Sequence, residues 1–306
     1  MSVTKKYLSL VKFSHTIFAM PFAMIGFFLG IRDWAPRGYY VEQPMMHKTA
    51  VYFQEHWMVF VLVVLCMVFA RSAAMAFNRY LDRGFDAKNP RTAIREIPAG
   101  LLKANTVLIF TMVNAGLFIL CTYFINKICF YLSPVALAVI LGYSYTKRFT
   151  AFCHLVLGLG LSLAPIGAYL AVTGVFAWLP VLFSLAVIFW VSGFDVIYSL
   201  QDEAFDADNK LYSMPSRYGK PFALQVSTVL HLLSAACVVM AGKIGYFNWL
   251  YWVGVLVFGG MLVYQHSIVK PDDLRRVNIA FMTANGLASV VFAVLVISDL
   301  IFVHSL

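Results

Sequence analysis

Two short segments of the sequence carry side chains whose types and spacing suit metal and phosphate chemistry. The first reads Asn78-Arg-Tyr-Leu-Asp82-Arg-Gly-Phe-Asp86, with an oxygen-bearing side chain at every fourth position. The second runs from Asp195 to Asp206, with acidic or phenolic side chains at positions 195, 198, 202 and 206. Spacings of three and four residues place side chains on one face of a helix. Each segment is therefore expected to present a row of oxygen ligands.

These rows of acids need a compensating cation. Like charges four residues apart destabilise a helix by a few tenths of a kcal/mol, and carboxylates close to hydrocarbon cost more. Mg²⁺ prefers carboxylate and amide oxygens, and it typically takes one or two protein carboxylates together with substrate phosphate oxygens. Two such clusters facing each other would hold Mg²⁺ ions that bridge to a diphosphate.

Two other interpretations of the acids remain. They could be solvated loop acids paired with neighbouring arginines, although two clusters at matched spacing favour the metal. They could also be the ion sites of a cation-coupled secondary transporter, which likewise uses membrane carboxylates.

Basic residues accompany both acidic segments and argue against a site for cations alone. The stretch Asn89-Pro-Arg91-Thr-Ala-Ile-Arg95 follows the first segment, Tyr143-Ser-Tyr145-Thr-Lys147-Arg148 precedes the second, and Lys210 follows the second. So many guanidinium and ammonium groups would weaken a site built only for cations. A metal-bridged diphosphate needs both signs, because acids hold the metals and Arg or Lys bind the phosphoryl oxygens.

The composition shows which elements must position these residues. Of 306 residues, 61% are hydrophobic and 12% are charged, against roughly a quarter charged in soluble domains. With a mean hydropathy of +0.80, the chain is expected to be an all-α, polytopic integral membrane protein that forms one domain over residues 1–306. Hydrophobicity without alternation argues against an outer-membrane barrel. Nine apolar runs are long enough to be candidate spans: 13–31, 57–77, 105–126, 128–146, 152–174, 178–200, 222–242, 247–269 and 277–304.

The distribution of basic residues predicts the orientation. When the connections are assigned alternately to two sides, seventeen of the 23 Lys and Arg residues fall on one side and five on the other, with Arg71 inside the second span. By the positive-inside rule the first side, which includes the N-terminus and both acidic segments, is cytoplasmic and the C-terminus is outside. The net charge of +9 therefore reflects membrane topology, and no nucleic acid and no obligate protein partner are expected.

Taken together, the two acidic motifs and the basic loop between them resemble the UbiA superfamily of intramembrane aromatic prenyltransferases. The likeness is particularly to the bacterial 4-hydroxybenzoate polyprenyltransferases of ubiquinone and menaquinone biosynthesis. It implies nine transmembrane helices around a central cavity in the bacterial inner membrane. It also implies that Mg²⁺ assists transfer of a polyprenyl group from its diphosphate to a ring carbon of an aromatic acceptor.

The resemblance assigns roles by position. It implies metal ligation by Asn78, Asp82, Asp86, Asp202 and Asp206. Catalytic roles fall on Asp82, Asp202 and Asp195, the last as a candidate to orient the acceptor hydroxyl or accept the ring proton. Substrate contacts are expected from Arg91, Arg95, Lys147, Arg148, Tyr198, Lys210 and His15.

The acceptor stays open at this point, because a family member that prenylates a naphthoate or haem would share the same metal chemistry. Two further patterns have structural interpretations. His154 and His231 are expected to be packed or hydrogen-bonded within the bundle, and Gly26-Phe-Phe-Leu-Gly30 is typical of a close contact between helices.

Overall fold

The computed structural model describes residues 3–11, 18–34 and 44–303, and these residues are almost entirely helical. The longer helices are α1 (Val3–Val11), α2 (Met20–Asp33), α3 (Met45–Asp86), α4 (Ala104–Ile125), α5 (Lys127–Thr146), α6 (Cys153–Thr173), α7 (Trp178–Ser199), α10 (Lys220–Ile244), α11 (Trp249–Ile268) and α12 (Asn285–Ser298). The shorter elements are η2 (Leu200–Asp202), α8 (Glu203–Asp208), α9 (Met214–Tyr218), and the π-helical turns η3 (Ile279–Ala284) and η4 (Asp299–Val303). Within the described ranges the β pairing is limited to one isolated bridge between Lys270 and Asp273.

Each of the nine predicted spans overlaps a helix, and seven helical segments are long and apolar enough to cross a membrane. The other two are α2 and α11. Helix α2 has 14 residues, fewer than the roughly 20 that a span needs. The 20 residues of α11 include two Trp and two Tyr and end near Gln265 and His266, which lowers their mean hydropathy. The all-α membrane fold is therefore confirmed, whereas the count of nine spans is not confirmed in full.

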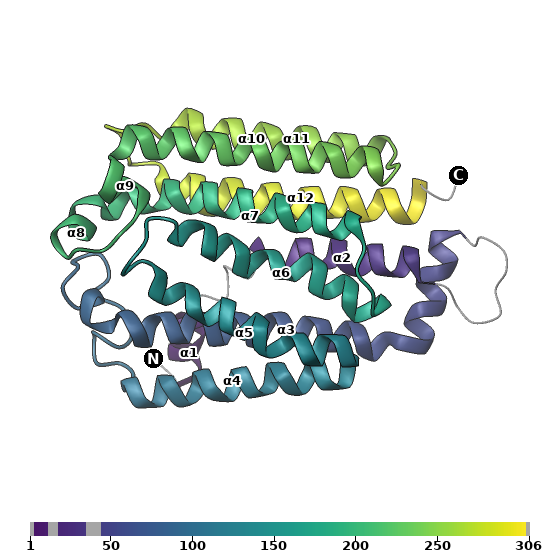
Figure 1. Cartoon of the computed structure of the whole chain (residues 1–306), viewed down its shortest axis with the longest axis horizontal. Coiled ribbons are helices and arrows are strands. Elements are labelled where there is room, and N and C mark those ends of the chain that lie inside the picture. Colours follow the sequence, from purple (N-terminus) through teal and green to yellow (C-terminus); the bar gives the residue numbers. More distant parts are fainter. Residues whose placement is uncertain (1–2, 12–17, 35–43, 304–306) are drawn as a thin grey trace.

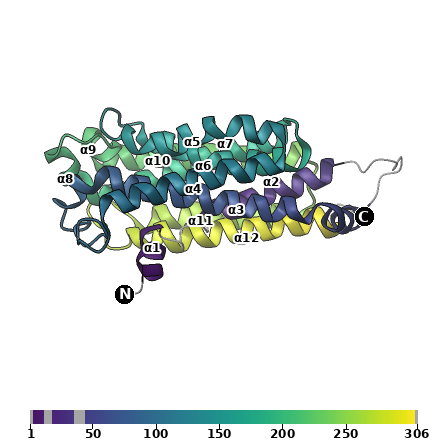
Figure 2. The same ribbon diagram turned by 90° about the horizontal axis from the view of Figure 1, so that it is seen from below.

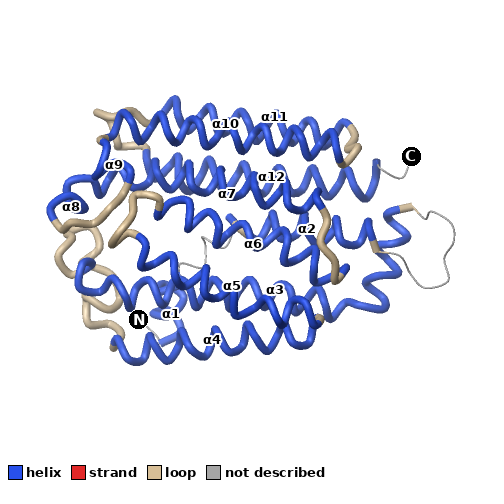
Figure 3. Tube along the Cα trace, viewed as in Figure 1, coloured by secondary structure: helices blue, strands red, loops and turns tan. Residues whose placement is uncertain are grey.

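The long helices lie side by side along the long axis of the molecule (Figure 1). In the view of Figure 1, α3, α4 and α5 form one side, α10 and α11 form the other, and α2, α6, α7 and α12 lie between them. The loops after α3 and α5, together with α8 and α9, gather at one end of the bundle (Figure 3). Helix α12 runs from that end toward the opposite end of the bundle (Figure 2). All segments that carry the predicted chemistry therefore meet at a single end.

Helix α7 lies at the centre of the main hydrophobic core. The indole ring of Trp190 is fully buried, and it packs against Phe22 of α2 and Phe258 of α11 with ring centroids 5.3 and 5.9 Å apart. Its Nε1 donates a hydrogen bond of 2.9 Å to Oδ1 of Asn285 at the start of α12. The indole thereby satisfies its polar group while its ring fills the core. These contacts fix α7, whose C-terminal end carries Asp195 and Tyr198.

The two glycines of the Gly26–Gly30 pattern lie against α6, as expected for a close helix contact. A Cβ atom on Gly26 would lie 2.0 Å from the backbone oxygen of Pro165, and one on Gly30 would lie 2.7 Å from Cβ of Val172. Small residues allow such close approach of backbones in a membrane. The contact therefore depends on the absence of side chains at these positions.

A tight turn joins α4 to α5 at the end of the bundle opposite the acidic segments. Asn126 caps α5, because its Oδ1 accepts a hydrogen bond of 2.9 Å from the backbone N–H of Cys129. Its Nδ2 donates to the carbonyl oxygen of Leu170 on α6 at 2.8 Å. One side chain thus closes the predicted hairpin and fixes it to a third helix.

Helix α1 packs on the loop between α3 and α4. The hydroxyl of Ser9 donates a hydrogen bond of 2.5 Å to Oε1 of Glu96, which is 6% exposed. The ammonium group of Lys6 donates to the carbonyl oxygen of Leu101 at 3.2 Å. These contacts hold the loop that carries Arg91 and Arg95.

Substitution Gly26→Ala is expected to destabilise the protein, because the added methyl group collides with backbone that cannot rotate away. Overpacking of this kind typically costs about 1–3 kcal/mol. Gly116→Ala on α4 is the matched control, since no atom lies within 4 Å of the Cβ position there. Thermal unfolding of both variants in lipid nanodiscs measures the difference. Equal unfolding temperatures for the two would contradict the contact.

Candidate active site

A polar pocket of about 220 Å³ opens among the ends of α3, α5, α6 and α7. Its wall contains every acidic residue of the two predicted motifs together with four predicted bases. The lining residues with polar side chains include Asn78, Asp82, Asp86, Asn89, Arg91, Thr92, Arg95, Tyr143, Lys147, Arg148, His154, Asp195, Tyr198, Asp202 and Asp206. Segments separated by more than 100 residues thus meet at the predicted site.

The first acidic motif occupies the last turns of α3. Asn78 donates a hydrogen bond of 3.1 Å through Nδ2 to Oδ2 of Asp82. The other oxygen of Asp82, Oδ1, lies 3.1 Å from Nη2 of Arg148, which follows α5. Asp86, one turn further on, lies 2.6 Å from Nη1 of Arg95. The helical spacing read from the sequence accordingly places all three side chains on the pocket wall.

The second motif does not lie on one continuous helix. Asp195 and Tyr198 belong to α7, but the chain tightens into a short 3₁₀ turn before α8, so Asp202 ends η2 and Asp206 lies on α8. Such turns are common where helices end. Asp206 is fully buried and accepts a hydrogen bond of 3.0 Å from the hydroxyl of Ser213.

Each of the four aspartates that are predicted to ligate metal is paired with one predicted base. The pairs are Asp82 with Arg148 at 3.1 Å, Asp86 with Arg95 at 2.6 Å, Asp202 with Arg91 at 2.5 Å, and Asp206 with Lys147 at 2.8 Å. Three pairs join segments that are distant in the sequence, and Asn89 adds a hydrogen bond of 3.2 Å to Asp202. The pairs neutralise charge that burial would otherwise make costly.

The ion pairs also shift the pKa values of two bases, Lys147 and Arg91, which lie outside the membrane-spanning helices. Burial disfavours the charged form of Lys147, but the carboxylate of Asp206 outweighs this and raises the pKa of the lysine above its ordinary value. Burial likewise disfavours the charged form of Arg91, but the charge of Asp202 outweighs it and raises the pKa of the guanidinium. Both bases are therefore held in their cationic forms, as binding of phosphate oxygens requires.

The oxygen atoms at this site fit a hard divalent cation. Oδ2 of Asp86 is buried and lacks a hydrogen-bond partner among the described residues, so one carboxylate oxygen remains for a metal. No group of three or more His, Cys, Asp or Glu side chains converges on one point within residues 3–11, 18–34 and 44–303. This donor set suits Mg²⁺, which completes its six ligands with water and phosphate oxygens around one or two carboxylates.

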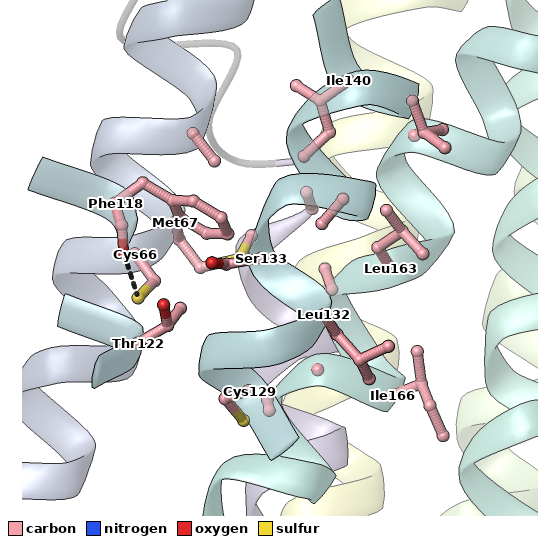
Figure 4. Close-up of a pocket in the computed structure, with 18 of the residues that line it drawn as sticks. Cys66, Met67, Phe118, Thr122, Cys129, Leu132, Ser133, Ile140, Leu163 and Ile166 are labelled. Atoms are coloured by element: carbon pink, nitrogen blue, oxygen red, sulfur yellow. Dashed lines mark hydrogen bonds between the residues drawn. The ribbon is translucent and has the colours of Figure 1, made fainter. Parts of the chain in front are cut away.

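A second, apolar cavity of about 380 Å³ adjoins the polar pocket. Figure 4 shows side chains from α3, α5 and α6, among them Met67, Leu132 and Leu163, around this cavity. Tyr143 and Leu157 line both cavities and so mark the boundary between them. A charged group and an apolar chain can therefore be accommodated side by side.

One charged residue, Arg71 of α3, lines the apolar cavity. Its Nε is buried and has no hydrogen-bond partner in the part of the chain that the structure describes. The sequence places Arg71 only as a charge within the second span. A buried guanidinium in hydrocarbon surroundings is costly unless an anion pairs with it, which makes Arg71 a candidate for anion binding.

Two further predicted contacts do not gain support from the geometry. Lys210 is exposed, adopts a positive φ of 55°, and does not line the pocket. His15 lies outside the described residues. Tyr198, in contrast, lines the pocket, and its hydroxyl accepts a hydrogen bond of 3.1 Å from Nη1 of Arg91.

The site also contains residues that sequence reasoning did not single out for it, namely Asn89, Thr92 and Ser213. Asn89 bonds Asp202, and the Thr92 hydroxyl donates to the backbone oxygen of Asp86 at 3.1 Å. Asn89 and Thr92 lie in the basic stretch from Asn89 to Arg95, so the arginines beside them could have indicated that they belong to the site. Ser213 has no such signal, because its contact depends on how the chain turns after α8.

Comparison with known proteins agrees with this geometry. The family model of the UbiA prenyltransferase family matches residues 49–287. A relative from Aeromonas salmonicida named 4-hydroxybenzoate octaprenyltransferase is 30% identical over 249 residues, which cover 80% of this chain and 83% of the relative. One from Nitrosomonas europaea with the same name is 29% identical over 79% of this chain and 83% of its own length.

Solved structures share the fold. A UbiA homologue from Aeropyrum pernix superposes with a TM-score of 0.75 at 24% identity and covers 95% of this chain and 98% of its own. A homologue from Archaeoglobus fulgidus, bound to GPP and Mg²⁺, gives a TM-score of 0.70 at 17% identity, with 97% and 99% coverage.

A bundle of apolar helices with an acid- and base-lined pocket at one end is suited to an enzyme that binds a charged substrate within a membrane. The match over most of its length shows that the chain belongs to the UbiA prenyltransferase family. It is thus a multi-pass membrane enzyme, a prenyltransferase, which favours the enzymatic hypothesis over the transporter.

Substitution Lys147→Met is expected to destabilise the protein, because it leaves the buried carboxylate of Asp206 without its cation. As 34% of the lysine side chain is exposed, we expect a loss of about 2 kcal/mol, below the roughly 3–5 kcal/mol typical of fully buried pairs. Denaturation of both proteins in mild detergent measures this change in the free energy of unfolding.

The double variant Lys147→Met/Asp206→Asn should recover most of that stability, because it leaves no unpaired buried charge at this pair. Lys103→Met, at an exposed position, is the control. A double variant no more stable than Lys147→Met would show that the unpaired carboxylate is not the cause.

Proposed function

We propose that this protein transfers a polyprenyl group from polyprenyl diphosphate to a ring carbon of an aromatic acid of the 4-hydroxybenzoate type, with Mg²⁺, in quinone biosynthesis. The observation that carries the proposal is the junction of two unlike cavities. A pocket with four acid–base pairs suits a metal-bridged diphosphate, and the apolar cavity beside it suits an isoprenoid chain. The names of the relatives and the ligands of the Archaeoglobus fulgidus homologue point the same way.

The donor diphosphate would lie in the polar pocket. Bound Mg²⁺, held by Asp82, Asp86, Asp202 or Asp206 with Asn78, would neutralise the negative charge that develops on the leaving diphosphate. Arg91, Arg95, Lys147 and Arg148 would donate hydrogen bonds to phosphoryl oxygens. This assistance lets the allylic C–O bond stretch or break.

The prenyl chain would pass the boundary at Tyr143 and Leu157 into the apolar cavity, with the remainder in lipid. A site without water prevents hydrolysis of the reactive allylic group. Asp195 lines the polar pocket near this boundary and would orient the acceptor hydroxyl or accept the ring proton.

The acceptor carboxylate has a candidate partner in Arg71. Arg71 lines the apolar cavity together with Tyr143, and its Nε lacks a partner within the described residues. Arginine binds carboxylates with paired hydrogen bonds. This supports an aromatic acid rather than an uncharged phenol as the acceptor.

The site is proposed to face the cytoplasm of a bacterium, with the protein in the inner membrane and the C-terminus outside. The basic loops lie at the end of the bundle that carries the pocket, and the positive-inside rule places such loops in the cytoplasm. The water-exposed diphosphate head group of the polyprenyl donor would reach the pocket from that side.

A membrane assay tests the proposed reaction. Membranes containing the protein receive one labelled polyprenyl diphosphate with 4-hydroxybenzoate, a dihydroxynaphthoate, haem or, as the acceptor without a carboxylate, phenol. Labelled product is expected with 4-hydroxybenzoate, less with phenol, and none after Mg²⁺ is chelated. Product with a naphthoate or haem alone would overturn the acceptor but not prenyl transfer, whereas no product with any acceptor would overturn the function.

Asp82→Ala and Asp202→Ala are each expected to lower the rate of prenyl transfer by about 100-fold or more, because the leaving diphosphate loses electrostatic stabilisation. Asp272→Ala, at an exposed loop position away from the pocket, is the control. Unfolding temperatures confirm that each variant is folded. Unchanged turnover in both site variants would contradict the proposed function.

The four ion pairs further predict that Mg²⁺ and diphosphate bind cooperatively. Mg²⁺ must draw carboxylates away from the bases, and diphosphate must draw bases away from the carboxylates, so each frees the partner of the other. Calorimetry with MgCl₂ alone, inorganic diphosphate alone and both together should show about 10-fold tighter binding of each in the presence of the other. Complexes formed in solution between the two are subtracted.

Arg95→Gln sharpens this experiment, because it leaves Asp86 without its base. Mg²⁺ alone should then bind more tightly, and the cooperativity should fall. Arg276→Gln, at an exposed loop position, controls for the change in net charge. Independent binding of the two ligands to the unaltered protein would refute the coupling.

A further inference from the structure

His154 lies in the first turn of α6, where the polar pocket approaches the apolar cavity. Its side chain is 4% exposed, and its Nδ1 is 2.7 Å from Oδ2 of Asp195 on α7. Both residues line the polar pocket, and Leu157, one turn along α6, lines both cavities. The pair therefore stands at the place where an acceptor ring would meet the allylic carbon of the donor.

Hydrogen bonds determine which nitrogen of His154 carries the proton. The backbone N–H of Met214 donates to Nε2 at 3.3 Å, so Nε2 is the unprotonated nitrogen. The proton is then on Nδ1, which donates to the carboxylate of Asp195. The imidazole thus holds one oxygen of Asp195, while 23% of the aspartate side chain remains exposed in the pocket.

The same imidazole is connected to the diphosphate end of the site. Met214 follows Ser213, whose hydroxyl donates to Oδ2 of Asp206 at 3.0 Å. Ser213 and Ser216 form a capping box that fixes this turn at the start of α9. A continuous path of contacts therefore runs from Asp206 through Ser213, Met214 and His154 to Asp195.

The backbone of His154 is fixed as well. The hydroxyl of Ser192 on α7 donates a hydrogen bond of 3.0 Å to its carbonyl oxygen. Gly158, one turn further along α6, approaches α7 so closely that a Cβ there would lie 2.5 Å from the backbone oxygen of Ile188. The two helices are held in register at the point where the imidazole reaches Asp195.

We propose that His154 is a positioning residue that acts through Asp195 and aligns this carboxylate with the diphosphate site. The inference rests on the proposed function, in which a ring carbon forms a bond to the allylic carbon while the C–O electron pair leaves with diphosphate. The proton on that ring carbon then passes to the carboxylate of Asp195. A carboxylate turned away by a single rotamer change could not receive it.

Two substitutions separate this role from simple packing. His154→Gln keeps a donor for Asp195 and an acceptor for the Met214 N–H, whereas His154→Leu keeps similar volume and supplies neither. For His154→Leu we expect kcat to fall about 100-fold, the loss typical of a misplaced catalytic group, while KM for polyprenyl diphosphate stays within about threefold. His154→Gln should keep most of the kcat.

His231→Leu is the matched control. His231 is also buried and hydrogen-bonded, packs against α7 at Gly193, and lines neither cavity. Its kcat should stay close to that of the unaltered protein. An equal loss of kcat in both leucine variants, or a His154→Gln variant as inactive as His154→Leu, would overturn the proposal.

Met214→Pro tests the same path without altering His154, in case the leucine variant does not fold. Met214 is the first residue of α9, where proline is tolerated, and Ser213 before it is extended. Removing this N–H should lower kcat and leave Mg²⁺-dependent binding of inorganic diphosphate, measured by calorimetry, unchanged. Unchanged kcat, or a loss of kcat explained by lost diphosphate binding, would contradict the path. Failure of the proposed function is distinct, since the unaltered protein would then form no prenylated product.

Discussion

Neutralisation of carboxylates at the edge of a hydrocarbon layer is the constraint on which this structure depends. Asp206 has no exposed surface, and Asp86 and Asp202 are each less than one-tenth exposed. Such groups remain charged only when a cation faces them. The chain meets this requirement with bases that come from two other segments, so the loops after α3 and α5 must lie over the end of α7. The capping of α9, the packing of α1 on the loop between α3 and α4, and the close contacts of α6 with α2 and α7 all help to hold these loops in place.

The apolar bundle supplies rigidity where the charged end cannot. Trp190 fixes α7 among aromatic rings, glycine allows α2 to approach α6, and Asn126 holds the far end of α5. None of these residues contacts a substrate in the proposed reaction. They matter because the acids and bases extend from helix ends, so a displacement of one helix would separate every pair to which it contributes.

The chemistry of the site could be predicted from the sequence more completely than its geometry could. Helical spacing identified the two acidic motifs, and the apolar runs located every long helix that could span the membrane. The position of Arg71 on the wall of the apolar cavity was not predictable, because helices that are apolar all round conceal which face points inward. Likewise, Arg91 and Asp202 are 111 positions apart, so no local pattern could pair them. The role of Met214 depends on a backbone N–H, which leaves no trace in residue identity.

The position of Lys147 and Arg148 directly after α5 has a consequence for how the site is held together. In the most apolar stretch of α5, 17% of the residues are buried within the protein, against 61% in the most apolar stretch of the segment from Trp178 to Asp208. Asp206 is thus fixed by a protein core, whereas its base Lys147 extends from a helix supported largely by lipid. A change in bilayer thickness shifts or tilts such a helix at modest cost. The surrounding membrane is therefore a structural component of the site, and its thickness sets how well opposite charges meet.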